Sequence, residues 1–538
     1  MDSDETDVVV IGAGHNALVA AAYLAKAGLA VTVLEAREVI GGGTVTEELT
    51  APGFRHDTFS SGHPWLVTNP LFAADELGLF RNGLSYVGND PVLVVPFRDG
   101  ESVTIWRDRR RTAAGIERFS RRDAAAWLEL YEDWGTLAPA HLARAARAPG
   151  ETLPPIAPEA ETRYAALLAK SCWDVVHERF ESDHVRGALL WFGMVAVQPI
   201  DRAGTGLLPL LVPVTWSEFG WLNVVGGSLR LAESLAAAVT AHGGRIVTGA
   251  RVSRIPVENG RAAGAVTEDG RYVRARRAVV SSMHFTALPR VVAARLPEPF
   301  LAGVEAWRAG PSLFVVHLAL AANPKVRARV GSMAAVLAGQ ATVAGIGQQL
   351  RNVAEGRLTW SEPWLFSACS SWIDPTRAPE GRGTLKVITY APYALDGDPA
   401  RWDAVKADYA DFLLKEYAGT IAAGFRPGDE LARHVASPLD IERTNASYFR
   451  GAAQGGEMVP DQMGLNRPVT GWANYRMPVA GLYQTGTSAH PGGPVSGWPG
   501  RLAARAVLED LNIDWQRVMP GAATRAPVHV PVIDTSAF

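Results

Sequence analysis

Hydrophobic and polar positions near the N-terminus follow two successive patterns. Asp7–Ile11 (DVVVI) is a continuous β-branched run, which predicts a strand buried on both faces of a parallel sheet. Asn16–Ala27 is rich in alanine and leucine and predicts a helix that Gly28 ends. Val31–Leu34 (VTVL) predicts a second buried strand. Together these segments predict a βαβ unit with two parallel strands.

A second block with the same patterns lies far along the chain. Leu229–Ala241 predicts a helix between two glycine pairs, and Arg245–Thr248 (RIVT) predicts a third parallel strand. Because Asn-Gly and Asp-Gly are strong hairpin signals, the segments after it predict a β-meander. Its strands are expected at Arg251–Val257, Arg261–Glu268 and Arg271–Arg276, and a further buried strand is expected at Ala278–Ser281.

A third block closes the pattern near the C-terminus. Gly481–Thr485 predicts a short strand, a glycine- and proline-rich turn follows it, and Arg501–Leu511 predicts a helix. The three blocks predict one discontinuous α/β domain formed by residues 1–70, 221–285 and 466–515. Residues 71–220 and 286–465 are richer in tryptophan, proline and amphipathic helix patterns and predict a second, α+β domain. No element is predicted for the tail, residues 516–538.

Composition and charge narrow the class of protein. The chain has 538 residues, of which 48% are hydrophobic and 20% charged, as is usual for a globular protein with more than one core. The net charge of −3 gives no electrostatic attraction to nucleic acid, so no nucleic-acid partner is expected. Two cysteines, Cys172 and Cys369, are too few and too far apart for a disulfide framework or a thiolate metal site. We therefore interpret both as buried structural thiols and expect no metal.

The N-terminal residues and the apolar runs indicate where in the cell the protein is located. The sequence starts with an acidic stretch, MDSDETD, which lacks the basic region of a signal peptide. The apolar runs Leu207–Val214 and Ser312–Ala322 are shorter than the ~20 residues that span a bilayer. We expect a cytoplasmic protein without a transmembrane segment and leave a peripheral membrane contact open. The sequence does not determine the oligomeric state.

The clearest chemical motif is Gly12-x-Gly14-x-x-Ala17, completed by Glu35 at the end of the second strand. Gly12 permits the tight turn, Gly14 lets a pyrophosphate approach the backbone, and Ala17 keeps the helix close to the sheet. The helix N-terminus offers unpaired N–H groups to phosphates, and Glu35 is suited to accept ribose hydroxyls. The motif predicts a dinucleotide site.

FAD and NAD both suit that motif, so other segments must decide between them. Gly41-Gly42-Gly43, preceded by Arg37, adds a second glycine turn close to the first. Gly486–Gly493 and Val495–Gly500 add glycine-rich segments at a strand-to-helix junction near the C-terminus. A dinucleotide contacted by both ends of a long chain indicates non-covalent FAD that stays bound, rather than NAD that exchanges in each turnover.

These segments also resemble a known family. DVVVIGAGHNALVAAAYLAKAG, VLEAREVIGG, RFESDHVRGAL, DPTRAPEG and PVAGLYQTGTSAHPGGPVSGWPGRLAA are similar to the phytoene-dehydrogenase-like (carotenoid desaturase-like) flavoproteins, in particular their pyridine-nucleotide-disulfide oxidoreductase-domain-containing branch. The resemblance runs from Asp7 to about Asp510. It implies a Rossmann-type FAD-binding domain of the glutathione-reductase/amine-oxidase superfamily type with a substrate-binding domain, and flavin chemistry on a largely apolar small molecule. The chain departs from the family pattern at Trp498-Pro499, where smaller residues are more usual.

The motifs and the resemblance together predict a set of cofactor-binding residues. Among them, the resemblance assigns backbone contacts with the adenine to Val252. The full set is Gly12, Ala13, Gly14, His15, Asn16, Ala17, Glu35, Ala36, Arg37, Gly41, Gly42, Gly43, Val252, Gly486, Thr487, Gly493 and Val495.

Few residues suggest a further chemical role. His490 lies in the C-terminal glycine-rich segment and is the candidate for a proton-transfer group, although bracing of that loop is the alternative. His63, Trp216 and Trp221 are candidates to line the substrate cavity; Trp191, Phe192 and Phe219 belong to the same aromatic group, and core packing explains this group equally well.

Three functions fit these features. The first is an FAD-dependent dehydrogenase or desaturase that passes a hydride from substrate carbon to flavin N5. The second is an isomerase or saturase of a polyene with the same bound flavin. Stoichiometric product formation without any electron acceptor would favour the isomerase. The third is a flavin-binding scaffold without catalysis, against which the intact glycine turns argue.

Overall fold

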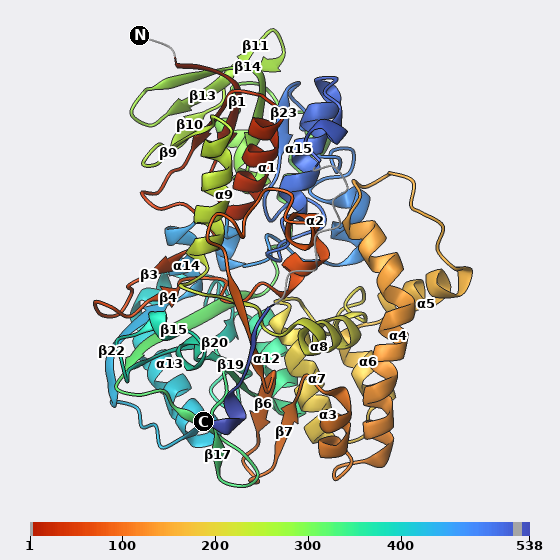
Figure 1. The fold of residues 1–538 in the computed structure, drawn as a ribbon, viewed down its shortest axis with the longest axis vertical. Coiled ribbons are helices and arrows are strands. Elements are labelled where there is room, and N and C mark those ends of the chain that lie inside the picture. Colours follow the sequence, from red (N-terminus) through yellow and green to blue (C-terminus); the bar gives the residue numbers. More distant parts are fainter. Residues whose placement is uncertain (1–3, 520–529) are drawn as a thin grey trace.

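The computed structural model describes residues 4–519 and 530–538. Figure 1 shows two parts stacked along the long axis, each built around a sheet. One sheet has the strand order β10-β13-β14-β1-β2-β9, with β23 also paired to β14, and the other has the order β22-β15-β20-β19-β18-β6-β7. The predicted α/β class with a second, mixed domain type is confirmed at the level of the fold.

The first sheet combines three distant stretches of the chain. Strands β1, β2, β9, β14 and β23 pair in parallel, whereas β13 pairs antiparallel with β14 and β10 pairs antiparallel with β13. Helices α9 and α15 both pack against α1. The bounds are β1 Asp4–Ile11, α1 His15–Lys26, β2 Val31–Leu34, α9 Leu229–Ala241, β9 Arg245–Val247, β10 Val252–Arg254, β13 Gly264–Thr267, β14 Tyr272–Ser281, β23 Leu482–Gln484 and α15 Trp498–Asp510.

Several elements of this part differ from the sequence prediction. The strands expected at Arg251–Val257 and Arg261–Glu268 are each divided in two, because β10 and β13 pair in the large sheet whereas β11 and β12 form a separate hairpin. The strands expected at Arg271–Arg276 and Ala278–Ser281 form one strand, β14, because its first half pairs with β13 and its second half with β23. Helix α15 begins at Trp498 rather than Arg501. Proline lacks only an N–H that the first helical turn leaves unpaired, so Pro499 does not delay the helix.

The second sheet carries helices on its flank (Figure 1). Its strands are β6 Leu93–Pro96, β7 Ser102–Ile105, β15 Ser312–Leu320, β18 Leu337–Gln340, β19 Leu365–Ala368, β20 Gly383–Ala391 and β22 Glu430–Ala436. The longer helices of this part are α3 Arg109–Ile116, α4 Arg121–Ala145, α5 Pro158–Leu168, α6 Cys172–Arg179, α7 Asp183–Val195, α8 Leu208–Phe219, α12 Val343–Ala354 and α13 Trp402–Glu416.

Shorter elements connect the two parts or extend them. They are β3 Thr46–Glu47, β4 His56–Asp57, α2 Pro70–Ala73, β5 Tyr86–Asp90, β8 Asn223–Val224, β11 Val257–Glu258, β12 Arg261–Ala262, α10 Leu288–Val291, α11 Glu298–Glu305, β16 Lys325–Arg327, β17 Ser332–Met333, β21 Ala422–Ala423 and α14 Pro438–Thr444.

Core packing crosses two of the predicted domain limits. Leu71, Phe72 and Leu79 share a core with α1, although they follow residue 70. Phe300 and Trp307 pack with residues of β1 and β13, although they follow residue 285. These segments extend the first part beyond the boundaries that the sequence predicts.

The C-terminal tail contains an element that the sequence pattern does not predict. Residues Val532–Asp534 form β24, which pairs in parallel with β5. Thr535 then donates a hydrogen bond to the carbonyl of Ala334 at 3.0 Å. The tail therefore returns to the second part of the molecule, while its residues 520–529 lie outside the described ranges.

A buried ion network joins the two parts. The Arg377 guanidinium lies beside Asp57, which ends β4, and its Nε donates to Asp374 at 3.0 Å. The two carboxylates also accept backbone N–H groups just before α9, Asp57 from Ser228 at 2.9 Å and Asp374 from Gly226 at 2.8 Å. Arg377 is only 1% exposed, so this network links both parts away from bulk solvent.

The cysteines are as the sequence indicates. Cys172 and Cys369 are free and buried, which confirms their interpretation as structural thiols. Burial raises the pKa of both thiols, that of Cys369 to about 12, so neither forms the thiolate that redox chemistry needs.

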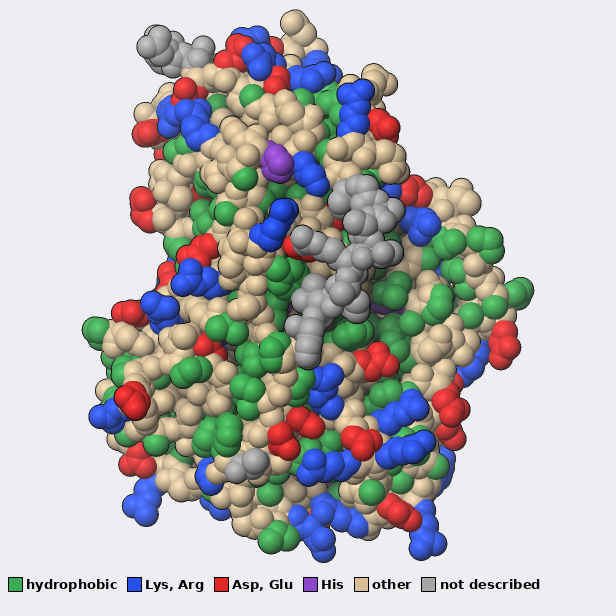
Figure 2. Space-filling model, in the orientation of Figure 1, with side chains coloured by type: hydrophobic (Ala, Val, Ile, Leu, Met, Phe, Trp, Pro, Cys, Tyr) green, Lys and Arg blue, Asp and Glu red, His purple; other side chains and the backbone are tan. Residues whose placement is uncertain are grey.

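The surface carries no single dominant charge on the face shown in Figure 2. Basic and acidic side chains are interspersed over both parts of the molecule there. Within residues 4–519 and 530–538, none of the helices has the length and apolar character needed to cross a bilayer.

Candidate active site

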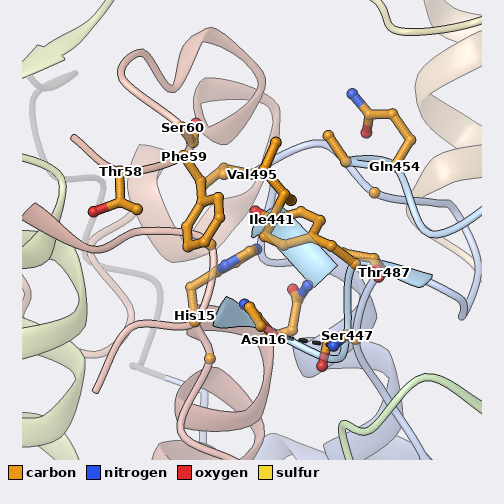
Figure 3. Close-up of a pocket in the computed structure, with 18 of the residues that line it drawn as sticks. His15, Asn16, Thr58, Phe59, Ser60, Ile441, Ser447, Gln454, Thr487 and Val495 are labelled. Carbon is orange, nitrogen blue, oxygen red and sulfur yellow. Dashed lines mark hydrogen bonds between the residues drawn. The ribbon is translucent and has the colours of Figure 1, made fainter. Parts of the chain in front are cut away.

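A cavity of about 360 Å³ extends between the two sheets and is lined by segments from along most of the chain. Figure 3 shows part of its wall, with His15 and Asn16 from α1, Phe59 from the segment after β4, and Thr487 and Val495 from the C-terminal loop. One end of the wall is formed by glycine turns and polar groups, the other by aromatic side chains.

Tight glycine turns form the polar end. Gly12 and Gly42 have φ of +91° and +57°, which side chains rarely adopt. A Cβ on Gly42 would lie 2.9 Å from the Cα of Gly14, so the two turns can approach this closely only because residue 42 is a glycine. Gly14 is the N-cap of α1 and gives no side-chain cap. The first N–H groups of α1 thus have no side-chain partner at the cavity.

Glu35 fixes the geometry of this end. One carboxylate oxygen accepts the Ala13 N–H at 2.6 Å and the other accepts the Arg37 N–H at 2.8 Å. The side chain is buried yet lines the cavity, and its remaining lone pairs are available to ligand hydroxyls.

Three polar side chains at this end have atoms without partners. His15 Nε2, Asn16 Oδ1 and Arg37 Nη1 are buried and make no hydrogen bond in the described structure. Burial lowers the pKa of His15 to about 4, so its imidazole is neutral near pH 7. Buried polar atoms normally have partners, so these three indicate a polar ligand at the start of α1.

Aromatic side chains form the opposite end. Trp216 and Trp221 line it with ring centroids 4.5 Å apart, and Phe366 lies 5.7 Å from Trp221. The other aromatic residues of the predicted group lie elsewhere: Trp191 and Phe192 are fully buried in the core, and Phe219 is 42% exposed on the surface. Trp216 and Trp221 therefore do both: they line the cavity and pack in the same core as Trp191 and Phe192.

Most of the predicted cofactor residues meet at this cavity. Ala13 and Gly41 do not line it but lie directly behind the wall, where the Gly41 N–H donates to the Ala13 carbonyl at 2.8 Å. The predicted residues that do line it are Gly12, Gly14, His15, Asn16, Ala17, Glu35, Ala36, Arg37, Gly42, Gly43, Val252, Gly486, Thr487, Gly493 and Val495.

Two predicted histidines lie away from the wall. His490 Nε2 donates to the Arg144 carbonyl near the end of α4 at 3.0 Å, and burial lowers its pKa to about 4. His63 Nδ1 lies 3.1 Å from the Tyr86 hydroxyl, and burial lowers its pKa to about 3. Neither residue is part of the cavity lining.

Sequence reasoning missed the segment Gly451–Gly456. Gly451, Ala453 and Gln454 line the cavity beside the C-terminal loop. A Cβ on Gly493 would lie 2.4 Å from the Cα of Gln454, so the two backbones are in direct contact. The glycine- and alanine-rich run RGAAQGGE was a signal for this close approach.

Lys386 was also missed. It lies on β20, lines the cavity and is buried, and burial lowers its pKa to about 8. Its ammonium group donates to the carbonyls of Asp57 (3.0 Å) and Phe59 and to the Ser61 hydroxyl (3.4 Å). All three donors are thus taken, and Lys386 holds the segment 58–62 in the cavity wall. A lone lysine in an apolar strand was the signal.

The fold and the cavity define a class. A parallel sheet, a glycine turn that opens α1 and an acid at the end of β2 form a dinucleotide site, and the unpaired N–H groups of α1 fit a pyrophosphate. A second sheet closes the cavity with an apolar end. This is the arrangement of a two-domain flavoprotein oxidoreductase.

Comparisons with known proteins identify the family. The model of the flavin containing amine oxidoreductase family matches residues 18–497, and the chain belongs to this family. It is therefore an FAD-dependent oxidoreductase. The described residues contain no group of three or more side chains placed to hold a metal ion.

Three curated proteins illustrate the relationship. The mouse pyridine nucleotide-disulfide oxidoreductase domain-containing protein 2 is 30% identical over 94% of each chain. A limonene dehydrogenase subunit of Castellaniella defragrans is 30% identical over 95% of this chain and 96% of its own. A lycopene-forming phytoene desaturase of Pantoea ananas is 26% identical over 93% and 99%. These relatives confirm the resemblance found in the sequence.

Solved structures support the fold. The crystal structure of an oxidoreductase from Methanosarcina mazei superimposes with a TM-score of 0.59 over 93% of this chain and 99% of its own, at 17% identity. At that identity the likeness concerns the fold.

Proposed function

We propose that the protein is a dehydrogenase or desaturase of a largely apolar small molecule. The observation that carries this proposal is a single cavity with a phosphate-binding type of turn at one end and an aromatic wall at the other. When bound, FAD supplies the two-electron acceptor that takes a hydride from substrate carbon. The protein orients the substrate and excludes water.

The proposal gives a role to many of the predicted cofactor residues. The first turn of α1 and Arg37 bind the pyrophosphate, Glu35 accepts the ribose hydroxyls, and the Val252 backbone contacts the adenine. Gly486, Thr487, Gly493 and Val495 line the flavin end, together with Gln454. The unpaired Arg37 Nη1 and the free lone pairs of Glu35 support these assignments.

The cavity favours a neutral substrate over an amine. Among the described residues, Glu35 is the only carboxylate in the lining, and it lies at the polar end. An ammonium group at the aromatic end would find no acidic partner and would lie on the same side as the Lys386 charge. The names of two relatives, a limonene dehydrogenase subunit and a phytoene desaturase, agree with a hydrocarbon-like substrate for this chain.

We extend the proposal to the roles of the two domains and to the location of the protein in the cell. We assign cofactor binding to the part predicted from residues 1–70, 221–285 and 466–515, extended by the segments that pack on it after residues 70 and 285, and substrate binding to the rest of residues 71–220 and 286–465. The glycine turns of the first part support the first assignment. Trp216 and Phe366 of the aromatic wall, which lie in the second part, support the second. Two unpaired cysteines agree with a cytoplasmic protein.

The experiment uses the purified chain. We expect a yellow protein that releases FAD on heating or in acid. Under anaerobic conditions, a monoterpene or an acyclic carotenoid precursor should bleach the flavin, whereas putrescine at the same concentration should not. Bleaching by the amine alone would overturn the substrate class. Product formation without any electron acceptor would indicate an isomerase instead.

His490→Asn is expected to lower turnover by less than about tenfold, an effect below ~1.4 kcal/mol on the barrier. The imidazole donates to the carbonyl of Arg144 and lies outside the cavity lining, so it braces the C-terminal loop against α4. Steady-state kinetics at matched flavin occupancy measures the effect. A loss of 10²–10⁴-fold, typical of a proton-transfer group, would contradict this role.

A further inference from the structure

Arg467 is a buried arginine whose side chain has no carboxylate partner. Three arginines are buried among the described residues: Arg377, Arg467 and Arg501. Arg377 lies between Asp57 and Asp374, and Arg501 pairs with Glu76 at 3.0 Å. Arg467 is 0% exposed and has no ion pair within residues 4–519 and 530–538. Its positive charge is therefore not balanced by an acidic side chain.

The contacts of Arg467 are backbone carbonyls, the Met463 sulfur at 3.5 Å from Nη1, and an aromatic face. Nη2 donates to the carbonyls of Thr487 at 2.8 Å and Gln454 at 3.0 Å, and Nη1 donates to that of Glu457 at 3.2 Å. The guanidinium carbon lies 5.3 Å from the centre of the Trp307 ring. The carboxylate of Glu457 faces Arg202 and Arg308 instead. Arg467 thus ties together the two segments that meet at the cavity.

The charge of Arg467 reaches the cavity. Thr487 and Gln454 both line it, and each accepts a hydrogen bond from the guanidinium through its carbonyl. Burial lowers the pKa of His284, another lining residue, to about 4, and the Arg467 charge lowers it in the same direction. Burial also lowers the pKa of Arg467 itself to about 9.

An unbalanced buried cation is costly, because several kcal/mol of hydration free energy are lost for each ion taken out of water. Carbonyl dipoles and a ring face recover only a part of this. A negative charge that arises inside the cavity would interact with Arg467 across a medium of low dielectric constant, and the attraction would be strong there. A ligand bound beside Thr487 and Gln454 would bring such a negative charge close to Arg467.

We propose that Arg467 raises the reduction potential of the flavin by stabilising the negative charge that reduction leaves on its ring. The inference rests on the proposed function, in which the flavin end lies at Thr487 and Gln454. A hydride, two electrons with one proton, passes from a substrate C–H bond to the neutral ring, and a second substrate hydrogen leaves as a proton to solvent. One negative charge remains on the ring, and Arg467 is the buried cation without an acidic partner that lies behind the wall formed by Thr487 and Gln454.

The test compares two variants of the FAD-bound enzyme by their midpoint potentials, measured by equilibration with redox dyes. Arg467→Met removes the charge but keeps an apolar side chain of similar length, and Arg467→Lys keeps the charge. We expect the equilibrium constant for reduction to fall at least tenfold in Arg467→Met, about 30 mV for a two-electron couple, and by much less in Arg467→Lys. Arg308→Met, which removes a more exposed cation that binds the same loop, should leave the potential unchanged.

Equal potentials in the wild type and in Arg467→Met would overturn the proposal, and so would equal losses in both Arg467 variants, because a purely structural role depends on the fork of hydrogen bonds and not on the charge. A chain that folds but binds no FAD would instead overturn the proposed function.

A measurement on the wild-type enzyme covers the case in which Arg467→Met does not fold. If the ring takes up one proton with two electrons, the midpoint potential falls by about 30 mV per pH unit between pH 6 and 8. A slope twice as large means that the reduced ring is neutral, which would overturn the proposal without any variant.

Discussion

Replacing Glu35 by arginine is expected to weaken FAD binding by about 10²–10⁴-fold. The carboxylate accepts the N–H groups of Ala13 and Arg37 and, in the proposed complex, the ribose hydroxyls. Hydrogen bonds to a charged group are worth about 1.5–3 kcal/mol each, and the loss of two corresponds to this range of affinity. Arginine cannot accept any of them. Titration of the apoprotein with FAD, followed by flavin fluorescence, measures the change.

Glu38→Arg provides the matched control. Glu38 is exposed and lies three residues after Glu35, so the same change of charge is made next to the site without touching the cavity wall. It should bind FAD like the wild type. If both variants bind FAD equally well, Glu35 does not hold the ribose.

Arg377→Met is expected to destabilise the folded protein by about 3–5 kcal/mol, because it leaves Asp57 and Asp374 buried without their cation. The effect should spread to both parts of the molecule, since the two carboxylates also hold the backbone before α9 through Ser228 and Gly226. Urea unfolding followed by circular dichroism measures the loss, and flavin release should shift to lower urea concentration.

Arg382→Met is the control for Arg377, because Arg382 lies in the same loop but is exposed. Its unfolding should stay within about 0.5 kcal/mol of the wild type, as for most surface substitutions. If Arg377→Met unfolds at the same urea concentration as the wild type, Asp57 and Asp374 do not need the guanidinium as a partner.

Local patterns predicted the elements around the polar end of the cavity. The β-branched runs of β1 and β2 can only be buried strands, and Gly12, Gly14 and Glu35 stand at the turn between strand and helix that a dinucleotide site requires. The hairpin signal Asn259-Gly260 likewise lies between the paired β11 and β12. Each of these predictions depends on residues that are near one another in sequence.

Contacts between distant residues were decided only by the tertiary structure. His490 is bound by Arg144, and Gln454 meets Gly493 and Arg467. Lys386 supports the wall formed by Phe59, more than 300 residues before it in the chain. Trp216 and Phe219 have similar side chains on the same helix, yet one lines the cavity and the other is exposed. Periodicity and turn chemistry report the local backbone, whereas which side chain faces a cavity, and which charge is left without a partner, depends on how the two sheets pack.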